Sequence, residues 1–103
     1  MSRIEQILGF LQESPDDNFL VHALALEYIK SGEDAKARQY FEQNRNANPE
    51  YVATYYHLGK LLERLGDTDG AIEIYRLGMD AAEAAGDRHA YSELRSVHEE
   101  LTF

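Results

Sequence analysis

The chain has 103 residues, of which 44% are hydrophobic and 28% are charged. This composition is typical of a folded globular protein and excludes a disordered chain of low hydrophobicity, and the length leaves room for one compact domain. Asp and Glu total 19 against 10 Lys and Arg, a formal net charge of −9. Because no basic run accompanies this acid excess, we expect neither nucleic acid nor an anionic membrane as a partner.

The absence of cysteine narrows the chemistry further. It excludes disulfides, thiolate nucleophiles and cysteine-ligated metal sites. The longest unbroken apolar run, Ala23 to Leu26, is far shorter than the roughly 20 residues that span a bilayer. The first residues include the charged Arg3 and Glu5, where a signal peptide would be apolar, so a cytoplasmic protein is predicted.

The first predicted element is a helix over residues 3–13. Ser2 and Glu5 have the spacing of a capping box, in which a hydroxyl and a carboxylate satisfy free backbone amides at a helix start. Apolar side chains then recur at helical spacing, and the pattern stops before Pro15. We expect a one-faced helix at this end of the fold, with the apolar positions Ile4, Ile7, Leu8 and Leu11.

The middle of the chain carries an internal repeat. The only two prolines, Pro15 and Pro49, lie 34 residues apart, each after a polar residue and before an acidic one. Other identities recur at the same period: Leu24 with Leu58, Gly32 with Gly66, Ala37 with Ala71 and Ala47 with Ala81. The period predicts two copies of one structural unit, residues 18–51 and 52–85.

Each unit is predicted to be a hairpin of two helices. In its first helix, apolar residues at i, i+3, i+4 and i+7 include a small residue, Ala25 or Gly59, that lets the second helix approach closely. Gly32 and Gly66 stand where the first helix must end in a left-handed conformation, which glycine adopts without steric cost. The predicted helices cover residues 17–31, 34–47, 51–65 and 68–85.

A last helix is predicted over residues 88–101. Tyr91, Leu94 and Leu101 form its apolar stripe, but they come two residues late relative to the 34-residue period. Arg95 and His98 occupy positions that a continuing repeat would keep small or aromatic. We therefore expect a terminal helix with one side in water, which an array this short needs at its ends.

These positions resemble the tetratricopeptide repeat, a helix-turn-helix unit of 34 residues. The resemblance covers residues 18–85 and implies an all-α fold, a short α-solenoid of antiparallel helix hairpins with about six helices, terminal capping helices included. It predicts a single domain over 1–103, divided into 1–16, 18–51, 52–85 and 86–103. The matching positions are Val21 and Tyr55, Leu24-Ala25 and Leu58-Gly59, Tyr28 and Leu62, Ala37 and Ala71, Phe41 and Tyr75, and Pro49, which Glu83 replaces in the second unit.

The resemblance also implies a function, a non-catalytic scaffold that binds a protein or peptide. In such arrays the first helix of each repeat lines a groove, and the lysines and arginine expected there favour an acidic or C-terminal carboxylate-bearing peptide. The lysine and asparagine clamp of the chaperone-binding members is not reproduced, because His22, Leu26, Tyr56 and Lys60 fill those slots. The candidate groove residues are Phe19, His22, Leu26, Lys30, Tyr56, His57, Lys60 and Arg64.

Other interpretations stay open. Phe19 or Leu26 could pack on the first helix or across a homodimer, and self-association is the alternative function. The basic residues could be ordinary ion-pair partners of Glu27, Glu33 or Glu63. No catalytic residues, metal ligands or cofactors are predicted, because none of the four histidines belongs to a recognisable motif.

Overall fold

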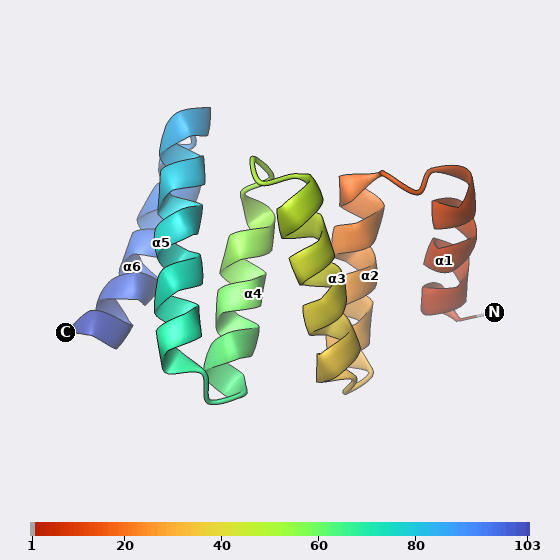
Figure 1. Ribbon diagram of the computed structural model, residues 1–103, viewed down its shortest axis with the longest axis horizontal. Coiled ribbons are helices and arrows are strands. Elements are labelled where there is room, and N and C mark those ends of the chain that lie inside the picture. Colours follow the sequence, from red (N-terminus) through yellow and green to blue (C-terminus); the bar gives the residue numbers. More distant parts are fainter. Residues whose placement is uncertain (1) are drawn as a thin grey trace. The chain divides into compact units, whose positions relative to one another are not determined.

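The computed structural model describes residues 2–103, which form six α-helices (Figure 1). This confirms the all-α fold, and the observed helix bounds differ from the predicted ones by two residues at most. The described residues contain no β-strand. The helices are α1 (Arg3–Glu13), α2 (Asn18–Lys30), α3 (Asp34–Ala47), α4 (Ala53–Arg64), α5 (Thr68–Ala85) and α6 (Arg88–Thr102).

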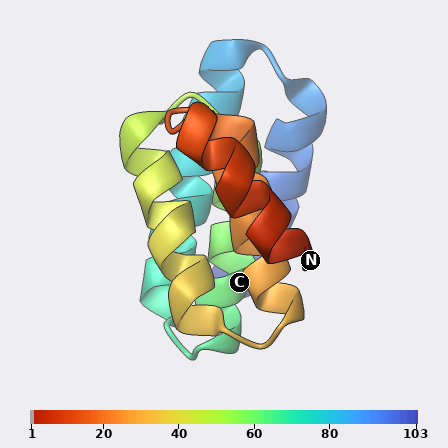
Figure 2. The ribbon, with the colours of Figure 1, turned by 90° about the vertical axis from the view of Figure 1, so that its right-hand side faces the viewer.

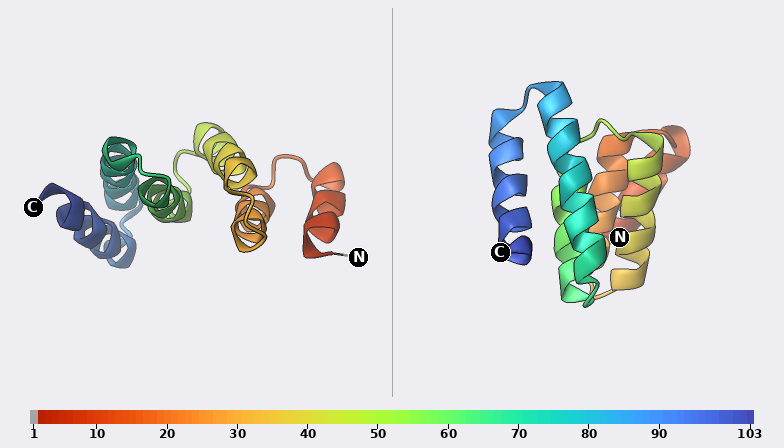
Figure 3. Two further views of the ribbon diagram at one scale, coloured as in Figure 1. Left: turned by 90° about the horizontal axis from the view of Figure 1, so that it is seen from below. Right: turned by 60° about the vertical axis from the view of Figure 1, so that its left-hand side comes forward.

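The helices group into two compact units, one ending at Asn48 and the other running from Pro49 to Phe103. In the first unit, α2 and α3 form an antiparallel hairpin, and α1 packs on α2, crossing it at an angle (Figure 2). In the second unit, α4 and α5 form the hairpin, and α6 runs back along α5 (Figure 3).

Three helices are followed by a glycine in a left-handed backbone conformation. Gly32, Gly66 and Gly86 have φ values of 79°, 85° and 70°, the left-handed region predicted for the first two. Behind Gly66, the amide of Asp67 donates to the carbonyl of Leu62 at 2.9 Å, so the last turn of α4 keeps its hydrogen bonds while the chain reverses. The reversal of the chain after these helices therefore depends on a glycine and on hydrogen bonds within a few residues of it.

Acidic and hydroxyl side chains cap the N-termini of several helices. The Asp17 carboxylate accepts from the amides of Phe19 and Leu20, at 3.0 and 3.1 Å, at the start of α2. Asp67 accepts from Gly70 at 2.9 Å at the start of α5. Ser2 caps α1 as its capping-box pattern predicts. Part of the acid excess therefore serves helix capping.

The core of the first unit lies between α2 and α3. Leu24, Ala25, Ala37 and Phe41 are fully buried, as the repeat pattern predicts. Asn44 is also buried, and its side-chain amide donates to the carbonyl of Asn18 at 3.1 Å, which joins the end of α3 to the start of α2. The hairpin is thus closed by apolar burial and by one polar link.

The core of the second unit repeats this arrangement. Leu58 is fully buried, and the ring of Tyr75 occupies the space where a side chain on Gly59 would stand. The Tyr75 hydroxyl donates to the carboxylate of Glu63 at the edge of this contact. α6 packs on α5, and its Leu94 and Val97 are buried. Val97 was not among the apolar residues expected on α6.

Candidate functional site: a cleft between α4 and α6

The second unit is hollowed on the face between α4 and α6. One hollow of about 440 Å³ lies between Tyr56 and His57 on α4 and His89 and Glu93 on α6. A second hollow of about 480 Å³ shares Tyr56, His89 and Glu93. Since the two hollows adjoin, we treat them as one site, the α4–α6 cleft, lined chiefly by Tyr56, His57, Lys60, His89, Glu93 and Glu100, with Leu94 and Val97 as apolar contacts.

Helical periodicity places these side chains on the cleft side of α4. Because successive residues are rotated by about 100°, Tyr56 and Lys60 lie about half a turn away from the buried Leu58 and Leu62, and His57 lies about a third of a turn away. Leu58 and Leu62 must be apolar because they pack inside the hairpin. The side of α4 that carries Tyr56 and Lys60 is not under this constraint and can hold polar groups.

The α4 wall of the cleft is aromatic and contains one cation. The rings of Tyr56 and His57 meet edge to face, with centroids 5.7 Å apart. The Lys60 ammonium lies 5.9 Å from the centroid of Tyr56 and 3.7 Å from a carboxylate oxygen of Glu63. Glu63 also accepts the hydrogen bond from Tyr75, so the partner of Lys60 is itself held in place.

The α6 wall is polar and mainly acidic. His89, Glu93, Ser96 and Glu100 follow one another at i, i+4, i+7 and i+11, one face of a helix. Nε2 of His89 lies 3.1 Å from a carboxylate oxygen of Glu93. Asp87 adds a third carboxylate at the start of the helix, where it accepts from the amide of Ala90 at 3.0 Å.

Burial keeps His57, the other basic side chain of the α4 wall, uncharged. Desolvation lowers the pKa of His57 below its usual value, so this imidazole is neutral at pH 7. The pKa of Tyr75 is raised, first by burial and then by its hydrogen bond to Glu63, so its hydroxyl remains a donor. Lys60 therefore contributes the one ammonium among the residues that line the two hollows, opposite His89 and the carboxylates of Asp87, Glu93 and Glu100.

The structure brings together three of the four candidate groove residues of this unit. Tyr56, His57 and Lys60 line the cleft, whereas Arg64 is exposed at the end of α4 and lines neither hollow. The basic stripe expected from Lys60 and Arg64 is therefore reduced, within the cleft, to a single lysine that is already paired.

The candidate residues of the first unit have different environments. Phe19 is 67% exposed, Leu26 is half-buried, and the exposed Lys30 pairs with Glu27 at 3.1 Å. His22 departs from the expected position on an open face. It is only 7% exposed, and its ring lies 5.7 Å from that of Phe41, because α2 is apolar on more than one side and buries this imidazole with its neighbours.

The α6 wall was missed by reasoning from the sequence. The spacing of His89, Glu93, Ser96 and Glu100 was visible in the sequence, but a polar face on a final helix is typical of a solvated cap. Only the placement of this face opposite Tyr56 identifies it as part of a site.

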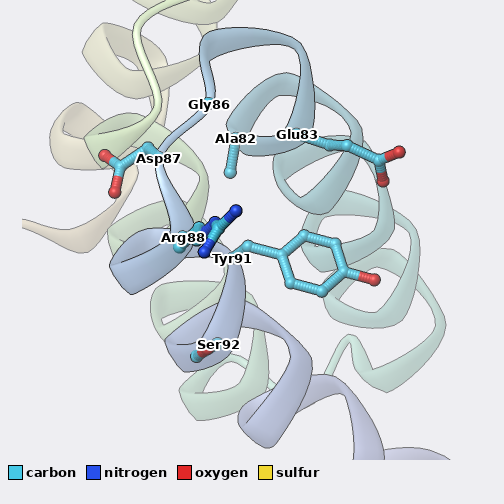
Figure 4. Close-up of a pocket in the computed structure, with 7 residues that line it drawn as sticks. All are labelled: Ala82, Glu83, Gly86, Asp87, Arg88, Tyr91 and Ser92. Carbon is cyan, nitrogen blue, oxygen red and sulfur yellow. The ribbon is translucent and has the colours of Figure 1, made fainter.

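A smaller hollow of about 380 Å³ lies where α5 ends and α6 begins (Figure 4). The ring of Tyr91 and the side chains of Ala82 and Glu83 line it, while the carboxylate of Asp87 points away from that ring. It contains none of the candidate groove residues, so the α4–α6 cleft remains the candidate site.

The described residues lack a metal-binding cluster and a membrane-spanning helix. Residues 2–103 contain no group of three or more His, Asp or Glu side chains arranged to hold a metal ion. None of the six helices in the same range is both long enough and apolar enough to cross a membrane.

Known proteins with a similar sequence and fold identify the family of this chain. The Tetratricopeptide repeat profile matches residues 52–84. The solution structure of a tetratricopeptide repeat domain protein from Salinibacter ruber is 41% identical, with a TM-score of 0.82 over 84% of this chain and 88% of that one. The chain belongs to the tetratricopeptide repeat family.

Another protein and another solved structure are also similar to this chain. A TPR repeat-containing protein of Pseudomonas aeruginosa is 28% identical over 91 residues, 88% of this chain and 87% of that protein. The solution structure of protein BPP2914 from Bordetella parapertussis shares the fold, with a TM-score of 0.83, 24% identity, and coverage of 99% of this chain and 89% of that one.

Proposed function

We propose that this tetratricopeptide repeat protein is a non-catalytic binding module that holds a protein or peptide segment in the α4–α6 cleft. The observation that carries the proposal is the pairing of an aromatic wall, Tyr56 with His57, and a polar wall that includes Glu93, around two adjoining hollows. Members of the family generally act as protein-interaction scaffolds.

Tyr56 is the expected anchor of the bound segment. Aromatic side chains with a polar end contribute much of the binding energy at protein interfaces, because they bury a large area at little entropic cost. Tyr56 is half-buried in the free protein and lines both hollows, so its ring is already oriented for contact. Leu94 and Val97 lie beneath the hollows but are almost fully buried, so the accessible apolar surface is chiefly that of Tyr56.

The first unit is proposed to add contacts of its own. Phe19 and Leu26 offer apolar surface on α2, and Lys30 a charge at its end. His22 is left out of the proposed contacts because of its burial.

A peptide selection tests the proposal without assuming a sequence for the partner. A random-peptide display library is selected on the immobilised protein, and the enriched peptides are then measured against Tyr56→Ala and Tyr91→Ala. Both substitutions remove a half-buried tyrosine from the second unit, but Tyr91 lines neither hollow of the cleft.

We expect Tyr56→Ala to weaken the binding of selected peptides by about tenfold or more, the size of effect typical of an interface anchor. Tyr91→Ala should leave it within about twofold. Circular dichroism of both variants checks that the helices remain. Peptides that bind Tyr56→Ala as tightly as the original protein would show that the cleft is not the binding site.

Self-association is a second candidate function. Three aromatic side chains are largely exposed, namely Phe10 at 58%, Phe19 at 67% and Phe103 at 97%, and such surface can pair with another copy. Light scattering distinguishes the two functions, because a chain of 11.8 kDa that keeps its monomer mass over a wide concentration range does not self-associate.

A further inference from the structure

We infer that the segment held in the α4–α6 cleft is positively charged, with Lys or Arg side chains paired to the carboxylates of Glu93 and Glu100. This inference rests on the proposed function of the same cleft and adds the chemical class of the partner. It reverses the expectation of an acidic peptide, which depended on a basic stripe that the cleft does not contain.

The first support is the balance of charge within the cleft. Asp87, Glu93 and Glu100 contribute carboxylates, whereas Lys60 contributes the one ammonium of the two hollows. Asp87 is engaged in capping α6, and Glu93 lies 3.1 Å from Nε2 of His89, a group that offsets its charge only when protonated. Glu93 and Glu100 are therefore the two carboxylates proposed to face a ligand. An acidic segment would have to approach these like charges, while a basic segment is attracted and oriented by them.

The second support is that Lys60 already has an ion-pair partner. Its ammonium lies 3.7 Å from Glu63, and Glu63 is kept there by the hydroxyl of the buried Tyr75. Recruiting Lys60 to an acidic ligand would therefore break an existing ion pair. His57 cannot take its place, because burial lowers its pKa and keeps the ring neutral at pH 7.

The spacing of the two acids suggests the pattern of the ligand. Glu93 and Glu100 are seven residues apart on one face of α6, which corresponds to about 10 Å along the helix axis. In an extended polyproline II segment, side chains three residues apart point in the same direction and lie about 9 Å from each other. A segment with a basic residue at every third position would thus present its charges to both carboxylates.

Two fluorescein-labelled peptides test the inference. They share one proline-rich sequence and differ only at every third position, which is arginine in one peptide and glutamate in the other. Binding is followed by fluorescence anisotropy, and the site is located by backbone amide shifts of the isotope-labelled protein. Two protein variants are compared, the cleft variant Glu93→Gln/Glu100→Gln and the control variant Glu73→Gln/Asp80→Asn.

The control variant removes the same number of negative charges from elsewhere in the unit. Glu73 and Asp80 pair with Arg76 on the exposed side of α5, at 2.6 and 3.2 Å, and line neither hollow. Exposed ion pairs contribute little to folding, so both double variants are expected to keep their helices. Any difference between the variants then reports on the cleft and not on the overall charge.

We expect the arginine peptide to bind at low salt and to shift the amides of Tyr56 and Glu93. Its affinity should fall about tenfold in the cleft variant, stay within about twofold in the control variant, and weaken as salt rises from about 50 to about 300 mM. Equal or tighter binding of the glutamate peptide would overturn the inference, as would an unchanged affinity in the cleft variant.

The two proposals fail in different ways. If library-selected peptides depend on Tyr56 but carry no excess of Lys or Arg, the cleft is a binding site and only the inferred charge is wrong. If neither fluorescein peptide shifts the amides of the cleft, the inferred charge is again wrong. If selected peptides do not depend on Tyr56, the proposed function itself fails.

Discussion

Gly59 determines how closely α4 and α5 approach each other. A Cβ atom at this position would collide with the ring of Tyr75, which is fully buried and whose hydroxyl is bonded to Glu63. The ring cannot move away without losing both its burial and this hydrogen bond. Gly59 therefore allows close packing of α4 against α5 by leaving room for the ring of Tyr75.

Substituting this glycine should destabilise the protein. Gly59→Ala adds one methyl group to a filled contact, and we expect the free energy of unfolding to fall by about 1–3 kcal/mol, the usual cost of overpacking. Urea denaturation followed by circular dichroism measures it.

Gly9→Ala is the matched control for this substitution. It makes the same change within a helix, and an added Cβ at Gly9 meets nothing within 4 Å. Because alanine favours helix more than glycine does, Gly9→Ala should be neutral or stabilising by up to about 1 kcal/mol. An equal loss of stability in both variants would contradict the packing role of Gly59.

At the residue scale, the sequence predicted the helix face of a side chain better than it predicted the contacts of that side chain. Periodicity placed Tyr56 and Lys60 on the side of α4 away from Leu58, and both line the cleft. The alternative that the basic residues are ordinary ion-pair partners is met by Lys60 with Glu63 and by Lys30 with Glu27. Periodicity could not predict the hydrogen bond from Tyr75 to Glu63, because it depends on the side-chain rotamers of two helices. It placed His22 on an open face, where one-helix periodicity has no information about the neighbours that bury it.

At the scale of the helices, each turn depends on a short sequence signal. Gly66 reverses the chain after α4 with φ 85°, and the Asp67 carboxylate caps α5 by accepting from Gly70. The helix bounds could be predicted within two residues because glycine, proline and acidic caps are local signals. The role of α6 could not, because Leu94 follows Leu58 by more than one repeat period and its polar face resembles a solvated cap.

The cap of α5 can be tested by one substitution. Asp67→Ala removes the acceptor of the Gly70 amide, so we expect a loss of about 0.5–2 kcal/mol in the free energy of unfolding. Asp16→Ala removes the same charge from an exposed position between α1 and α2 and should change it by less than about 0.5 kcal/mol. Urea denaturation of the two variants compares them, and similar losses would show that charge matters here and capping does not.

At the scale of the whole molecule, the main property is the net charge of −9. Acid caps and short ion pairs such as Arg76 with Glu73 account for some of the carboxylates, but the excess over basic residues remains. Like charges on one small chain repel one another and destabilise the compact state. Lysine is also scarce, with three residues against seven arginines.

Added salt should therefore stabilise the protein. We expect the thermal midpoint to rise as sodium chloride increases from about 50 mM to about 1 M, because the Debye length falls from over 10 Å to about 3 Å and screens the repulsion. Differential scanning calorimetry measures the midpoint. A midpoint that stays constant or falls would show that the surface acids are already balanced by their local partners.

The opposite sides of α4 separate two kinds of evolutionary constraint. Leu58 and Gly59 face α5 and are fixed by packing, whereas Tyr56 and Lys60 face the cleft and contribute little to the core. Mutations on the cleft side can therefore change this surface without destabilising the hairpin. The packing of one hairpin can in this way be inherited unchanged while its cleft surface diverges.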